Sequence, residues 1–88
     1  MQSKNKKAPT SSESRHIGRV KDTACALCDA PPPVEAHEIK QGAWFTSVGV
    51  CPECHRGGLG IHGDRRLLRI KKVDELDLLN ITLSRVSA

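Results

Sequence analysis

The feature that most constrains this chain is a doubled Cys-x2-Cys motif, Cys25/Cys28 and Cys51/Cys54, with 22 residues between the two pairs. Two residues between thiolates let both sulfurs of a pair reach one tetrahedral ion at about 2.3 Å, and the second pair completes a four-thiolate shell. The chain has 88 residues and only 2% aromatic residues, so its core is thin without a staple. We predict one structural zinc ion (Zn2+) held by all four cysteines.

The alternatives for these cysteines are disulfides or a redox motif. The N-terminal segment MQSKNKKAPTSSES has no apolar stretch of the kind a secretory signal needs, and no apolar run is long enough to cross a membrane. We therefore expect a cytoplasmic protein without a membrane partner, in a compartment where thiols stay reduced. A thioredoxin-like redox motif would need a βαβ unit, which this chain is too short to build.

Basic charge is concentrated in two places. The formal net charge is +4, and residues 1–22 account for it, with six Lys or Arg against Glu13 and Asp22. We predict a disordered basic tail over residues 1–11 and a single domain over residues 12–88. Clustered basic charge suits nucleic acid, although solvated helix faces give the same pattern. The second basic cluster lies within residues 56–72, where Asp64 is the one acidic residue. It consists of Arg56, Arg65, Arg66, Arg69, Lys71 and Lys72.

Three helices are predicted. Ser12 could cap a first helix that carries Ile17 and Val20 on one face, and a second helix should run from near Gly63 or Asp64 to about Lys72, after a glycine-rich loop. Asp74 could cap the last helix. Its apolar stripe could serve a core or a dimer, so monomer and homodimer both stay open; the stripe consists of Leu76, Leu79, Leu83 and Val86.

A β-hairpin is predicted between the two cysteine pairs. Residues 34–40 (VEAHEIK) and 44–50 (WFTSVGV) could form short strands around a turn at Gln41-Gly42, after a rigid connector containing three consecutive prolines. Both strands are too short to be stable alone, which again points to zinc as the organiser.

Histidines are the candidates for chemistry, because a four-thiolate zinc ion is coordinatively closed. His37 lies in the predicted hairpin, His55 directly follows Cys54, and His62 comes seven residues later. Closure of the zinc site would bring His55 near His37. We therefore predict a second metal site formed by these three histidines.

These segments resemble a known family. CALC, AHEIKQG, TSVGVCPECH and IHG, within residues 16–88, look like the HNH (ββα-metal) endonucleases, particularly small phage proteins similar to recombination-enhancement (Ref-type) nucleases. The resemblance implies a small α+β zinc-bound domain with a treble-clef-like ββα-metal core, two CxxC knuckles and flanking N-terminal and C-terminal helices. It also implies that His37, His55 and His62 hold a catalytic metal, Mg2+ or another divalent ion.

Two positions depart from the family pattern. Glu38 stands, beside His37, where the family has its catalytic histidine, and Thr46 stands where the family has its central asparagine. A glutamate can accept a proton, but its ordinary pKa of about 4.3 makes it a weak base unless burial raises that pKa. Glu38 could instead be a metal ligand or a surface ion-pair partner. The Thr46 hydroxyl could still brace the loop as a supporting residue.

The sequence thus predicts a metal-dependent DNA endonuclease or nickase linked to recombination or DNA processing. Glu38 and His37 would be its catalytic residues, and a recombinase or other phage protein is an expected partner, in the host cytoplasm if the chain is phage-encoded. A catalytically inactive HNH-fold module that binds DNA or a protein, or a purely structural zinc domain, is the alternative. The predicted DNA-binding residues are Lys40, Arg56, Arg65 and Arg66.

Overall fold

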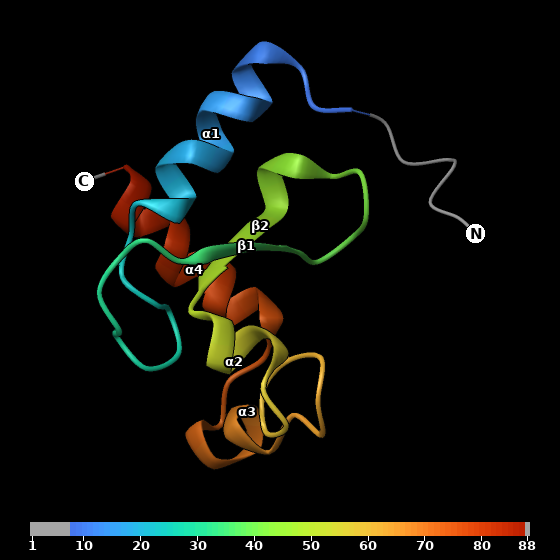
Figure 1. Ribbon diagram of the computed structural model, residues 1–88, viewed down its shortest axis with the longest axis vertical. Helices are drawn as coiled ribbons and strands as arrows, with labels where there is room; N and C mark the ends of the chain where they lie inside the picture. The colour runs from blue at the N-terminus through green and yellow to red at the C-terminus, as the bar shows by residue number, and fades with distance from the viewer. Residues whose placement is uncertain (1–7, 88) are drawn as a thin grey trace.

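A two-stranded antiparallel sheet lies at the centre of the computed structural model, which describes residues 8–87 (Figure 1). Strand β1 (Glu35–Glu38) pairs with β2 (Ser47–Val50) in a register that sets His37 opposite Val48. The predicted hairpin is confirmed, and together with the surrounding helices it makes a small α+β domain.

The second strand is shorter than predicted. Its expected first half forms a 3-10 helix, η2 (Trp44–Thr46). The hydroxyls of Thr46 and Ser47 donate to the carbonyls of Ala43 and Trp44, at 2.8 and 2.7 Å, and these side-chain bonds hold the backbone in a turn. The prediction of a strand over these residues is therefore wrong.

Helix α1 (Ser11–Lys21) begins earlier than predicted. Its N-cap is Thr10, whose hydroxyl accepts the backbone N–H of Glu13, while the Glu13 carboxylate accepts the N–H of Thr10. Among the candidate caps only Thr10 has a glutamate three positions later, and this reciprocal pair explains why Ser12 is not the cap. The tail predicted over residues 1–11 thus ends sooner, and its first seven residues lie outside the described part of the chain.

Two short helices follow β2. Helix α2 (Pro52–Arg56) leads into a glycine loop, where a Cβ on Gly60 would lie only 2.2 Å from the Cys54 carbonyl oxygen. Helix α3 (Arg66–Lys71) starts later than predicted because Arg65 adopts a left-handed backbone, with φ of 63°. The predicted glycine break is confirmed, and it brings the chain back against α2.

The last helix, α4 (Glu75–Val86), is capped by Asp74 as predicted, but its buried face coincides only in part with the predicted stripe. Leu76 and Leu83 are 67% and 37% exposed, whereas Leu78 and Thr82 are buried. The helix packs on β2, where the Gly49 N–H donates to the Thr82 hydroxyl at 3.1 Å. Of the predicted stripe, Leu79 packs against the core, whereas Leu76 and Leu83 are exposed.

The hydrophobic core is formed by residues of β2, α2, α3 and α4 and of the loops that flank the sheet. Two cysteines belong to it, so the predicted zinc site is part of the core rather than an attachment to it. The buried apolar members are Cys25, Leu27, Val34, Val48, Val50, Cys54, Ile61, Leu68 and Leu78.

Candidate metal centres

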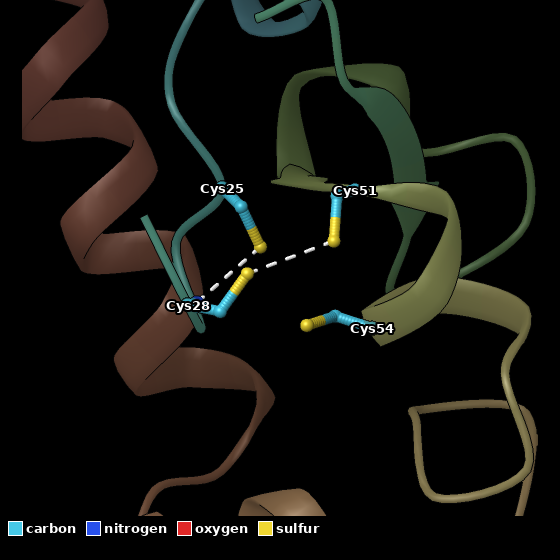
Figure 2. Close-up of side chains that lie close together, drawn as sticks. All are labelled: Cys25, Cys28, Cys51 and Cys54. Carbon is cyan, nitrogen blue, oxygen red and sulfur yellow. Dashed lines mark hydrogen bonds between the residues drawn. The ribbon is translucent and has the colours of Figure 1, made fainter. Parts of the chain in front are cut away.

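The side chains of the four cysteines converge on one point (Figure 2). Cys25 and Cys28 come from the loop after α1, Cys51 is the N-cap of α2, and Cys54 lies within α2. All four sulfurs lie within 4.8 Å of one another, and the Cys28 and Cys51 sulfurs are 3.7 Å apart. Two sulfurs at 2.3 Å from a tetrahedral ion would be about 3.8 Å apart. The cluster could therefore bind a zinc ion, as predicted.

Backbone hydrogen bonds shape the first cysteine pair. Asp29 adopts a left-handed backbone with φ of 65°, and the Cys25 N–H donates to the Ala30 carbonyl at 2.8 Å. The Ala26 N–H donates to the Gly49 carbonyl on β2, also at 2.8 Å. The first pair is thus bonded to the strand that leads directly into the second pair.

The thiols of this cluster differ in acidity. Burial, reinforced by neighbouring thiols, raises the pKa of Cys54 far above its ordinary value. Burial also acts to raise the pKa of Cys25, but backbone N–H groups outweigh it, and the net pKa is lowered. Four neighbouring thiolates require a cation to balance their charge, so binding of a dication and release of the thiol protons are coupled.

The three predicted histidines also come together. His37 from β1, His55 from α2 and His62 from the glycine loop have ligand atoms within 4.8 Å of one another. His55 Nε2 lies 3.3 Å from His37 Nδ1 and 3.1 Å from His62 Nε2. Nitrogens at 2.0–2.1 Å from one tetrahedral ion would be about 3.3 Å apart. The predicted grouping of the three histidines is confirmed, and their separations fit a shared ion.

Two carboxylates orient these rings. Glu75 Oε2 lies 2.5 Å from His37 Nε2, and Glu35 Oε1 lies 2.8 Å from His55 Nδ1. A carboxylate only accepts, so each of these ring nitrogens carries the hydrogen. In the neutral rings, His37 Nδ1 and His55 Nε2 then face each other as lone pairs, an arrangement that a cation between them would stabilise. Metal-binding histidines are commonly oriented by carboxylates in this way.

An arginine holds each carboxylate. Arg56 donates to both oxygens of Glu35, at 3.0 and 2.5 Å, and Arg65 donates to Glu75 at 3.1 Å. The hydrogen bonds from Arg56 and His55 lower the pKa of Glu35. Partial burial acts to raise the pKa of Glu75, but hydrogen bonds from His37 and Arg65 outweigh it and lower the net pKa. Both groups are therefore carboxylates at neutral pH.

Sequence reasoning missed both carboxylates. A local signal existed for Glu35, which is two residues before His37 on β1 and therefore on the same face of the strand. Glu75 gave no local signal, because 38 residues separate it from His37.

Glu38, the predicted catalytic residue, has a role in the hairpin turn. Its Oε1 accepts the backbone N–H of Gly42 at 2.9 Å. Glu38 borders the same pocket as His37 but is not one of the clustered metal ligands. Thr46 lies at the same turn end of the hairpin, where its carbonyl accepts the Ile39 N–H at 3.2 Å.

The histidines line an open pocket with a volume of about 470 Å³, which Arg65 and Glu75 also border. The predicted DNA-binding residues Lys40, Arg56, Arg65 and Arg66 are all exposed. Three of them are in ion pairs, Arg66 with Asp64 at 3.4 Å and the other two arginines with the carboxylates described above. Their contact with DNA stays a prediction.

The described residues thus define a small α+β domain with two side-chain clusters, each arranged to hold a metal ion. Comparison with protein-family models, with curated proteins and with solved structures finds no match to this chain. Within residues 8–87, none of the helices has the length and apolar character needed to cross a membrane.

Proposed function

We propose that this chain is a metal-dependent endonuclease or nickase of the HNH (ββα-metal) kind that acts on DNA. The observation that carries the proposal is the set of three imidazole nitrogens that converge at an open pocket bordered by the exposed Arg65. A pocket of this kind leaves room for a phosphate beside the ion, unlike the closed four-cysteine cluster.

The ligand set favours a transition metal ion over Mg2+. Imidazole nitrogens suit Zn2+, Ni2+ or Co2+, whereas Mg2+ prefers carboxylate oxygens and water. The two carboxylates of the site are already hydrogen-bonded to histidine and arginine. When bound, such an ion acts as a Lewis acid on a phosphate oxygen and stabilises the charge that develops in the transition state.

The chain's own residues would bind the DNA backbone and move a proton. Lys40, Arg56, Arg65 and Arg66 contact phosphates, which makes affinity fall with rising salt. Glu38 orients or deprotonates the water that attacks phosphorus, and the bond from phosphorus to the 3′ oxygen breaks. Sequence specificity is weak, because these residues recognise the backbone rather than the bases.

A second candidate is a module of the same fold that binds DNA or a protein without cleaving it. The observation that favours it is the hydrogen bond from the Gly42 N–H to Glu38, which ties the residue at the base position into the hairpin turn. This candidate predicts salt-sensitive binding with no strand cleavage.

Nicking of supercoiled plasmid separates the two candidates. Purified protein of measured zinc content is incubated with plasmid and Mg2+, Mn2+, Co2+ or Ni2+, alongside His37→Ala, Glu38→Ala and Glu38→His. We expect nicking by the wild type and its loss in His37→Ala; nicking that survives His37→Ala would eliminate the proposed site. Binding without nicking under every metal would favour the second candidate, and a gain of nicking in Glu38→His would identify the missing base.

A further inference from the structure

The first residue of α4 contacts the histidine cluster. Glu75 is 23% exposed, and its Oε2 lies 2.5 Å from Nε2 of His37, whose side chain is 7% exposed. We propose that Glu75 is a positioning residue that fixes the tautomer of His37 and so sets the affinity of the three-histidine centre for its metal. This inference rests on the metal centre of the proposed function, and not on cleavage.

The tautomer decides whether His37 can bind the ion. A neutral imidazole has one N–H and one lone pair. With the hydrogen on Nε2, bonded to Glu75, the lone pair lies on Nδ1, which faces His55 at 3.3 Å. Without this carboxylate, either nitrogen could carry the hydrogen, and the form with Nδ1–H could not act as a ligand at that atom.

Helix α4 holds this carboxylate in place. Asp74 and Asp77 form a capping box around its first turn, and Leu78, one turn after Glu75, is fully buried. At the other end, Arg85 donates to the carbonyls of Ala24 and Cys25, at 2.9 and 3.2 Å. The helix therefore spans from the histidine cluster to the first cysteine pair.

Arg65 fixes the second carboxylate oxygen. Its Nη2 donates to Glu75 Oε1 at 3.1 Å, so Oε2 is left for His37. Restraint of both oxygens keeps the carboxylate in one orientation and lowers the entropy lost when it orients the ring.

A purely structural role for Glu75 makes a different prediction. An acidic residue in the first turn of a helix is stabilising whether or not it touches a histidine. Asp77 provides the matched control, because it is acidic and lies in the same first turn. Asp77→Asn removes the same charge, keeps a side-chain oxygen that can accept the Asp74 N–H of the capping box, and leaves the contact with His37 intact.

The first test measures the affinity of the second metal site for Co2+ in the full chain loaded with one equivalent of zinc. The protein and a chromophoric chelator compete for the Co2+. We expect Glu75→Ala to weaken binding of the second metal roughly 10- to 100-fold. Glu75→Gln should lose less metal affinity, because its amide oxygen still accepts a hydrogen bond. Asp77→Asn should bind the second metal as tightly as the wild type. Equal Co2+ affinity in Glu75→Ala and the wild type would overturn the proposal, as would equal losses in Glu75→Ala and Asp77→Asn.

The second test reads the tautomer without the second metal. In long-range 1H–15N NMR spectra of the same one-zinc protein, His37 should show a protonated Nε2 and a lone pair on Nδ1. This single pattern should give way to a mixture of both tautomers in Glu75→Ala but be retained in Asp77→Asn. A His37 ring with hydrogen on Nδ1 in the wild type would refute the proposal. Both readouts are independent of DNA cleavage, so failure of the nicking assay and failure of this inference are separate results.

Discussion

Cys54 and His55 are adjacent residues of α2, yet their side chains belong to different clusters. Cys54 is 3% exposed and is part of the hydrophobic core, together with the other buried cysteine of its cluster. His55 is half-buried and lines the open pocket with two other histidines. One five-residue helix therefore contributes one residue to a buried cysteine cluster and one to a histidine cluster at an open pocket, and each cluster could hold a metal ion.

This arrangement gives the two centres separate tasks. Such short strands and helices are not stable by themselves, so the position of His55 depends on closure of the cysteine cluster. The reverse dependence is weak at His62, because that histidine is exposed. Damage to the cysteine cluster should consequently abolish both centres, whereas loss of the His62 side chain should leave the fold intact.

The largest effect is expected at the cysteines. Structural zinc contributes roughly 10–16 kcal/mol in zinc-finger peptides, which is comparable to the whole stability of a domain, about 5–15 kcal/mol. We expect Cys54→Ser, or a strong chelator, to unfold the chain, as measured by far-ultraviolet circular dichroism with and without added zinc.

The exposed cysteine separates metal binding from packing in that measurement. Cys28 is exposed, so Cys28→Ser removes little buried surface but takes away one thiolate. If the metal carries the stability, Cys28→Ser unfolds the chain nearly as readily as Cys54→Ser. A Cys28→Ser variant that stays folded without zinc would contradict the proposal that metal binding by the cysteine cluster stabilises the fold.

An intermediate effect is expected on α4, the helix that reaches both centres. Leu78→Ala should destabilise the domain by about 2–5 kcal/mol, because it leaves a cavity at a fully buried position. The matched control is Leu76→Ala, two residues away and 67% exposed, which should change stability by less than about 0.5 kcal/mol. Urea unfolding of the zinc-loaded variants measures both losses of stability. A larger loss in Leu76→Ala than in Leu78→Ala would mean that α4 buries the stripe predicted from the sequence.

Sequence reasoning succeeded where spacing along the chain is short. Two residues between paired cysteines predicted the four-cysteine group, and the position of His37 between the two pairs, with His55 next to Cys54, predicted the histidine group. It failed for the buried face of α4, because the leucines of that helix offer more than one apolar stripe. The buried face contains Leu78 and Thr82, and the Thr82 hydroxyl accepts the Gly49 N–H, a contact that an apolar pattern does not contain.

Contacts between residues far apart in the sequence could not be predicted from the sequence pattern either. The hydrogen bond between His37 and Glu75 requires α4 to be docked on β2, and nothing near Glu75 in the chain indicates a metal centre. The same holds for Glu38, whose bond to Gly42 follows from the conformation of the turn rather than from residue type. The family resemblance assigned the position of the catalytic base to Glu38, whereas in the structure Glu75 is the carboxylate that contacts His37.

The smallest effect on stability is expected at the open centre. His62 is exposed and comes from the glycine loop, so His62→Ala should change the free energy of unfolding by less than about 0.5 kcal/mol in protein carrying one zinc ion. The same substitution removes one of three imidazole ligands, so the second equivalent of Co2+ or Zn2+ should bind much more weakly. Urea unfolding and metal titration on the same samples measure both quantities. A large loss of stability in the one-zinc protein would mean that the histidine cluster also supports the fold, and the division of tasks between the two centres would be wrong.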